Sequence, residues 1–207
     1  PGPAGRKIGE AFKEVVSFVG RRRWLERWIL LEALGGYIFS MTMPYQLVYA
    51  IEYKGADEFI VGYMLAALYA SSVALSPLAG KLADKIGRVK TILVMRPLFA
   101  ISTLMFLYAP GPEYLVLAFA LLGAFFSSST AFQTLALELV PAECRGRWMG
   151  LRVLISLLAR SPAPAVGGLL FTQISPSAPF LAAIAIDSLL RVPLIYKTPE
   201  TLWDRVE

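Results

Sequence analysis

The stretch Gly80-Lys81-Leu82-Ala83-Asp84-Lys85-Ile86-Gly87-Arg88-Val89-Lys90 is a short charged connector between two long apolar runs. Six such runs occur in the chain, at residues 28–51, 59–78, 89–108, 114–139, 148–173 and 179–196. Each is long enough to form about 27–39 Å of helix, which spans a bilayer core. Backbone groups inside a bilayer must be hydrogen-bonded within the segment, so these runs are helices and not isolated strands. The sequence therefore predicts an all-α membrane protein with six transmembrane helices.

The composition agrees with a membrane protein. Of the 207 residues, 57% are hydrophobic and only 17% are charged, which is less charge than a soluble domain carries. The chain contains no histidine and a single cysteine, Cys144. Catalysis by Ser-His or Cys-His pairs is thereby excluded, as is a cysteine-cluster metal site. We expect no catalytic residues, no bound metal and no cofactor.

The basic residues mark one side of the membrane. Lysine and arginine gather at residues 21–27, in the 80–90 connector, at Arg145 and Arg147, and in the tail, whereas the three other loops together hold only Lys54. Basic loops face the cytoplasm, so both termini are predicted to be cytoplasmic. This alternation also explains the net charge of +5 without nucleic acid as a partner. We expect the plasma membrane to hold the protein.

Three regions follow along the chain. Residues 1–27 comprise a Pro/Gly-rich start and a basic amphipathic segment over 8–19, which we expect to lie on the membrane surface or to act as a solvated linker helix. Residues 28–196 form the transmembrane bundle. Residues 197–207 form a cytoplasmic tail.

The connector resembles the signature loop between the second and third helices of major facilitator superfamily transporters. The matching residues are Gly80, Asp84, Lys85, Gly87, Arg88 and Lys90. The glycines permit close helix approach and a tight turn. The resemblance implies a gating role, in which Asp84 bonds Arg88 or backbone donors of a neighbouring helix. A plain basic cytoplasmic loop is the alternative.

Two further stretches are similar to the same family. The loop 141–147, following Glu138, resembles the loop between helices four and five, which adds Arg145 and Gly146 to the gating residues. The segment 163–168 resembles the family's antiporter-type bend in helix five, but Ala163 replaces its first glycine. A packing kink produced by proline and glycine is the other interpretation.

The family has two six-helix halves, and a substrate site lies between such repeats. This chain covers one half. The absence of arginine from 114–139 and the basic lead-in favour the C-terminal half. A half-size chain that dimerises is the alternative. Either way, the expected partners are the lipid bilayer, a second six-helix half and a small solute, with a coupling proton as an option.

Five of the charged residues within the apolar runs are candidate functional charges: Glu32, Arg96, Arg160, Asp187 and Arg191. A charge at the bilayer centre costs at least ~2.5 kcal/mol and marks a functional position by default. Arg160 and Asp187 fall at similar depths, so we expect them to pair or both to line water. Asp187 and Arg191 share a helix face, and Glu32 could pair with Arg96. The alternative role for each is an ion pair that only holds helices together.

The resemblance implies that the first and fourth helices line the central cavity. Its polar candidates are Tyr37, Tyr45, Gln46, Ser127, Thr130 and Gln133. Interfacial placement is the competing role for Tyr45, and interhelical hydrogen bonding is the competing role for the hydroxyl groups. The predicted function is secondary transport of a small solute by alternating access. A non-transporting membrane scaffold or receptor on the same fold is the alternative.

Overall fold

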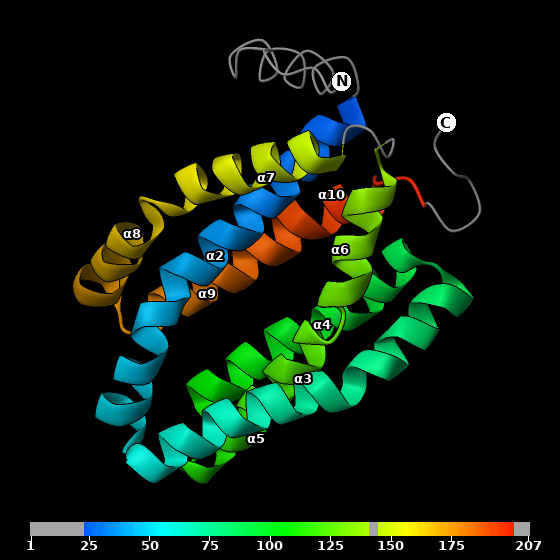
Figure 1. Ribbon diagram of the computed structural model, residues 1–207. Coiled ribbons are helices and arrows are strands. Elements are labelled where there is room, and N and C mark those ends of the chain that lie inside the picture. The colour runs from blue at the N-terminus through cyan, green and yellow to red at the C-terminus, as the bar shows by residue number, and fades with distance from the viewer. Residues whose placement is uncertain (1–22, 141–144, 201–207) are drawn as a thin grey trace, which may run out of the picture.

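The computed structural model describes residues 23–140 and 145–200, and every regular element within them is helical (Figure 1). The predicted amphipathic segment 8–19 lies outside these residues, as do part of the 141–147 loop and most of the tail. The described chain forms six helical rods. Their elements are α2 (Arg23–Lys54), α3 (Glu58–Ile86), α4 (Arg88–Tyr108), α5 (Glu113–Phe126), α6 (Ser129–Glu138), α7 (Arg145–Arg160), α8 (Ala163–Leu169), η2 (Leu170–Ile174), α9 (Ala178–Ile186), η3 (Asp187–Arg191) and α10 (Val192–Tyr196).

Five rods are long and apolar enough to cross a membrane: 58–86, 88–108, 113–138, 145–174 and 178–196. The predicted span 28–51 lies within α2, which is amply long at 32 residues. Its apolar character is diluted by polar residues such as Glu32 and Gln46. Both of these residues line the cavity described below. The mean hydropathy of α2 is therefore lower because part of its surface faces this cavity.

Three of the rods are interrupted. The predicted span 114–139 is divided into α5 and α6 by a turn at Ser127 and Ser128. The predicted span 148–173 is divided near Pro162, which cannot donate a backbone hydrogen bond to the preceding turn. The last rod contains the π-helical turn η3, which begins at Asp187. Such wide turns are frequent at functional sites.

The connector 80–90 is less of a loop than the sequence suggested. Helix α3 continues through Asp84 and Lys85 to Ile86, and α4 starts at Arg88, so Gly87 alone separates the two helices. Gly87 has φ of +103°, a backbone conformation that favours glycine. The prediction of a tight glycine turn is confirmed, and the prediction of an eleven-residue hinge is wrong.

The rods gather into two groups (Figure 1). Helix α2 lies against α7, α8 and α9, whereas α3, α4 and α5 lie together, with α6 beside α3 and α4. Glycines permit the closest approaches. In the first group, Gly167 of α8 lies against the Met41 carbonyl and the Tyr45 ring of α2. The bend near 163–168 is therefore a site of close helix packing.

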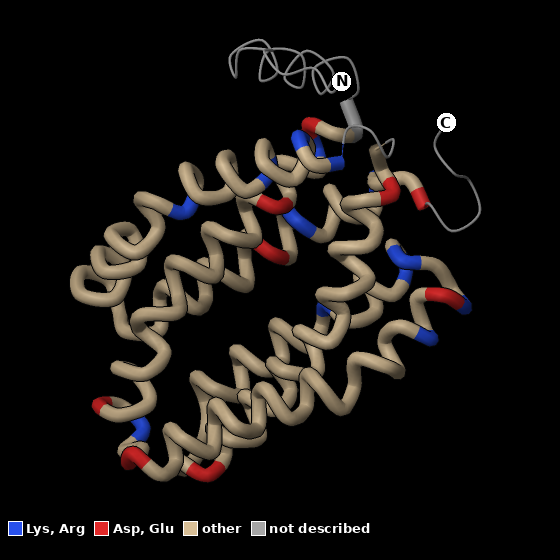
Figure 2. The backbone as a smooth tube through the Cα atoms, in the orientation of Figure 1, with Lys and Arg blue, Asp and Glu red and all other residues tan. Residues whose placement is uncertain are grey.

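Charged residues occupy mainly the two ends of the bundle (Figure 2). One end carries the basic residues at the start of α2, around the α3–α4 turn and at the start of α7. At the opposite end Lys54 is accompanied by Glu52, Asp57, Glu58 and Glu113. The basic end is the one that the positive-inside rule assigns to the cytoplasm.

The contact at Gly123 provides a test of this packing. A methyl group there would collide with the Leu68 carbonyl and Ser71 Oγ of α3, and overpacking of this kind costs about 1–3 kcal/mol. We expect Gly123→Ala to lower the melting temperature of the purified protein in detergent. In the control Gly62→Ala on α3, where nothing lies within 4 Å of the added atom, no loss is expected. Equal melting temperatures for the two variants would contradict the close α3–α5 approach.

Candidate functional site: a charged cavity between two helix groups

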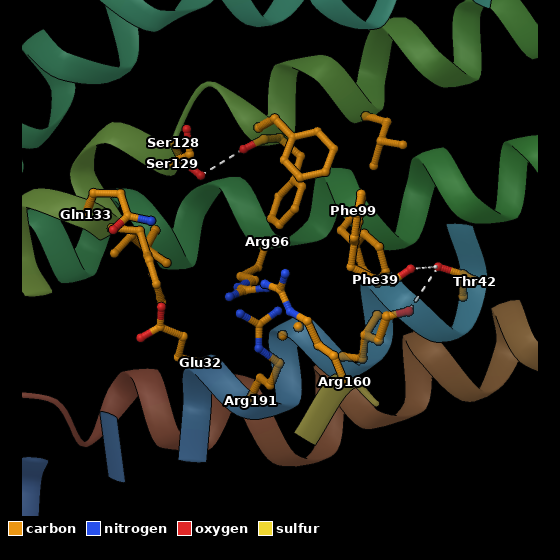
Figure 3. Close-up of a pocket in the computed structure, with 18 of the residues that line it drawn as sticks. Glu32, Phe39, Thr42, Arg96, Phe99, Ser128, Ser129, Gln133, Arg160 and Arg191 are labelled. Carbon is orange, nitrogen blue, oxygen red and sulfur yellow. Dashed lines mark hydrogen bonds between the residues drawn. The ribbon is translucent and has the colours of Figure 1, made fainter. Parts of the chain in front are cut away.

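A cavity of about 350 Å³ lies between the two helix groups. Its walls come from α2, α4, α5, α6, the end of α7 and η3. Part of the lining is aromatic, with Phe39, Phe99, Phe125, Phe126 and Phe132. The polar part includes three arginines from three different elements, Arg96, Arg160 and Arg191, whose side chains converge (Figure 3).

Asp187 lies between two of these arginines. Its Oδ1 accepts a hydrogen bond from Arg96 Nη1 at 2.6 Å and another from Arg191 Nη1 at 2.9 Å. The side chains of Arg96 and Asp187 are only 5% and 4% exposed. One carboxylate therefore connects α4 to η3, and the i,i+4 pair with Arg191 is present as the spacing predicted.

The expected pair of Arg160 with Asp187 is wrong. Asp187 is paired with Arg96 and Arg191, and Arg160 lines the cavity from the last turn of α7. The Nε atom of Arg160 is buried and has no hydrogen-bond partner within the described residues. Depth along the helix was predicted from sequence, but the direction of each side chain depends on how the helices pack.

The expected pair of Glu32 with Arg96 is also wrong. Glu32 binds Arg152 of α7 through two hydrogen bonds, from Nε at 2.5 Å and from Nη2 at 2.9 Å. This forked geometry is the strong form of a guanidinium–carboxylate contact. Gln133 Oε1 of α6 also accepts from Arg152 Nη2, at 3.3 Å. The contact joins both helix groups, because α6 lies beside α3 and α4.

Arg152 was not among the sequence-predicted sites. It lies four residues into the run that begins at Trp148. A signal was available: Arg152, Ser156 and Arg160 recur at intervals of four, which places them on one stripe of a helix. That stripe faces α2 at Glu32 and Gly36.

Two glycines of α2 make room for the guanidinium groups. A methyl group on Gly35 would lie 2.5 Å from Arg191 Nη2, and one on Gly36 would collide with Arg160 Nε. Arg191 Nε also donates to the Leu31 carbonyl of α2 at 3.2 Å. The absence of side chains at Gly35 and Gly36 therefore leaves the space that the Arg191 and Arg160 side chains occupy.

Two of the six predicted cavity residues, Gln46 and Gln133, line the cavity. Tyr45 instead donates from its hydroxyl to the Pro164 carbonyl at 2.8 Å, and Ser127 donates to the Ala124 carbonyl at 2.7 Å. Tyr37 packs against an apolar cluster, and Thr130 is exposed without lining the cavity. The neighbouring positions Ser128 and Ser129 line it instead, because the turn between α5 and α6 rotates the serine run.

The residues at the basic end of the bundle form a second cluster. Arg88 pairs with Glu138 at the end of α6, and the backbone amides of Arg88 and Val89 donate to the Glu200 carboxylate at 3.0 Å. Asp84 is exposed and, across the part of the chain that the structure describes, has neither an ion pair nor a hydrogen bond. The predicted Asp84–Arg88 contact is thus replaced by contacts of Arg88 with α6 and of its amide with the tail.

The remaining connector residues are at or near the surface. Gly80 has open space around it, and Lys85 is exposed. Arg145 donates from Nε to the Leu137 carbonyl at 3.1 Å, and Gly146 has no atom near its side. Residues 23–140 and 145–200 contain no group of three or more Cys, Asp or Glu residues that could hold a metal ion.

Asp187→Asn tests the buried triad. Removing the carboxylate leaves two arginines buried without a counter-charge, and breaking a buried pair in this way costs about 3–5 kcal/mol. We expect a large fall in the melting temperature in detergent and a lower yield of folded protein. The control Glu52→Gln removes an exposed carboxylate and should leave both unchanged. A melting temperature for Asp187→Asn equal to that of the control would show that the triad does not stabilise the bundle.

Comparison with known proteins agrees with this architecture. The sequence model of a family described as Major Facilitator Superfamily matches residues 29–201. A protein named "Putative metabolite transport protein YwtG", from Bacillus subtilis (strain 168), is 31% identical over 127 residues. The match covers 59% of this chain and 28% of the relative, so the chain corresponds to only part of that protein's length. The chain belongs to the major facilitator superfamily, and it is a multi-pass membrane protein from a family of solute transporters and not of enzymes.

Proposed function

We propose that this chain is one six-helix half of a secondary transporter that moves a small solute by alternating access. The observation that carries the proposal is the cavity between the two helix groups, which combines aromatic walls with a buried cluster of charges. Uniformly apolar packing, which a membrane scaffold would permit, leaves no such space. The alternative of a non-transporting module therefore has less support.

The proposed arrangement in the membrane follows from the charges. The basic end, with both termini, faces the cytoplasm, and the protein resides in the plasma membrane as a six-span bundle. The cavity then lies near the middle of the bilayer, where Arg160 and Asp187 were expected by depth. A second half, from the same polypeptide or from another copy, completes the site. In this scheme α2 contributes Gln46 and α6 contributes Gln133 and Ser129 to the solute path.

Two charged contacts are proposed to make this half move as a unit. Glu32 and Arg152 connect α2 and α7, with Gln133 of α6 attached. Arg88 and Glu138 connect the start of α4 to the end of α6 at the cytoplasmic end. A rigid half can rock against its partner without exposing these ions to lipid, where each would cost at least ~2.5 kcal/mol. A proton could be carried only by a carboxylate released from its arginine, so Glu32, whose side chain is 18% exposed, is a better candidate than Asp187.

Cysteine accessibility tests alternating access without a known substrate. The only native cysteine, Cys144, is first replaced by serine. A single cysteine is then placed at Gln46 or Ser129, which line the cavity, or at the control position Val73, which is 73% exposed on α3 and is expected to face lipid. Thiols react as thiolates and therefore need water. We expect a membrane-impermeant maleimide to label Gln46→Cys and Ser129→Cys in both right-side-out and inside-out vesicles, and Val73→Cys in neither.

Labelling of the cavity positions from one side alone, or from neither side, would argue for the scaffold. Labelling of all three positions would mean that the lipid-facing surface has been assigned wrongly, which would remove the basis for a water-filled cavity.

The same assay tests the cytoplasmic-end contact. Arg88→Gln removes the pair with Glu138, so we expect the labelling rate at Ser129→Cys from the cytoplasmic side to change severalfold. Lys85→Gln, which removes an exposed positive charge three residues earlier, should leave that rate unchanged. Identical rates for the two variants would mean that the Arg88–Glu138 pair does not govern opening at this end.

A further inference from the structure

The buried charges of the bundle do not balance. Four arginines meet two carboxylates in the middle of the described helices: Arg96, Arg152, Arg160 and Arg191 against Glu32 and Asp187. Glu32 is occupied by Arg152, and Asp187 is shared by Arg96 and Arg191. Two positive charges are therefore left without a buried counter-charge, and Arg160 forms no ion pair in this part of the chain.

The unbalanced charge faces the cavity. Arg96, Arg160 and Arg191 all line it, and their guanidinium groups point toward one another (Figure 3). The Nε atoms of Arg96 and Arg160 are buried, yet no hydrogen-bond acceptor is available to either within the described residues. The whole Arg96 residue is only 6% exposed. Buried guanidinium donors without acceptors are costly, so they indicate an acceptor that occupies the site at some stage of the cycle.

Resting on the proposed transport function, we infer that the solute is a small anion, bound by Arg160 together with the free donors of Arg96 and Arg191. The planar fork of a guanidinium matches a carboxylate or a phosphate. The aromatic residues around it, with the Arg96 guanidinium 5.4 Å from the centre of the Phe125 ring, suit an apolar or ring-shaped remainder. A solute with one or two negative charges neutralises the surplus and lowers the cost of placing it within the membrane.

Glycine residues at the site favour the same interpretation. Gly36 is the position where any side chain would displace Arg160, and Gly35 is where one would displace Arg191. Both guanidinium groups are thereby held at the α2 wall of the cavity, beside Arg96 from the opposite helix group. Helix packing alone would not require two arginines to pack against the two adjacent glycines of α2.

The test measures thermal unfolding of the full-length protein in lipid nanodiscs at constant ionic strength. The probes are glucose, glucuronate and glucose 6-phosphate, which share a sugar ring and differ in charge, together with succinate and inorganic phosphate. We expect a saturable rise in melting temperature with at least one anion and none with glucose. The carboxylate and phosphate probes separate the two forms of the shared chemistry.

Arg160→Gln assigns the effect to the site. Loss of one charge-assisted contact weakens affinity for the stabilising anion by about tenfold or more. Without ligand, this variant should be at least as stable as the wild type, because an uncompensated charge has been removed. Arg160→Lys, which retains the charge, should keep part of the anion response. Arg27→Gln, which removes an exposed arginine near the start of α2, should retain the full anion response.

Stabilisation by glucose alone, or by no probe, would overturn the anion proposal. The same holds if Arg160→Gln destabilises the ligand-free protein, since an acidic group of the second half would then be the partner of Arg160. Uptake of the stabilising anion into proteoliposomes separates the two proposals. Saturable anion binding without uptake would contradict the transport proposal and leave the anion proposal standing. Cysteine accessibility from both sides without anion binding would contradict the anion proposal and leave the transport proposal standing.

Discussion

The Asp187 carboxylate is the contact on which the centre of the bundle depends. It is the only acid bound to Arg96 and Arg191 in the described structure, and it joins the two helix groups at a site where its side chain is buried. A charge placed there without a partner would cost several kcal/mol. The π-helical turn η3 begins at Asp187 and ends at Arg191, so it contains both members of the i,i+4 pair. The position of the cavity wall thus depends on electrostatic satisfaction as well as on apolar packing.

The remaining buried charges follow from the same constraint. Glu32 is satisfied by the forked contact with Arg152, so α2 and α7 are held together by a second ion pair. Arg160 also lines the cavity, and its Nε atom has no acceptor among the residues described. A fully paired network would stabilise the bundle but would bind nothing. At the cavity the arginines are not all paired with carboxylates, so guanidinium donors remain available to bind an anion. This incomplete pairing is the physical basis of the anion proposal.

Family membership and local chemistry answer different questions. The match to the major facilitator superfamily establishes that the chain belongs to a family of membrane transporters, and the similarity to a metabolite transport protein covers too little of that relative to transfer a solute. The proposed solute class comes from the arginines, their missing acceptors and the aromatic walls of this chain. The contacts of Arg88 with Glu138 and Glu200 have a different role, since they lie at the basic end and connect helix termini.

Hydropathy and the pattern of basic residues in the sequence determined that the chain is helical, where five of the six predicted spans lie, and that Gly87 turns the chain, because these properties depend on length, composition and local backbone preference. Sequence also identified five charges within the apolar runs as candidate functional residues, although it missed Arg152. Only the tertiary structure decided their partners. Asp187 could face Arg160 or Arg96 according to helix rotation, and Glu32 binds Arg152, which was not among the predicted site residues. Pairing depends on which helices are neighbours and on the turns that rotate them, such as the break at Ser127 and Ser128, and neither property is encoded in the hydropathy of a single segment.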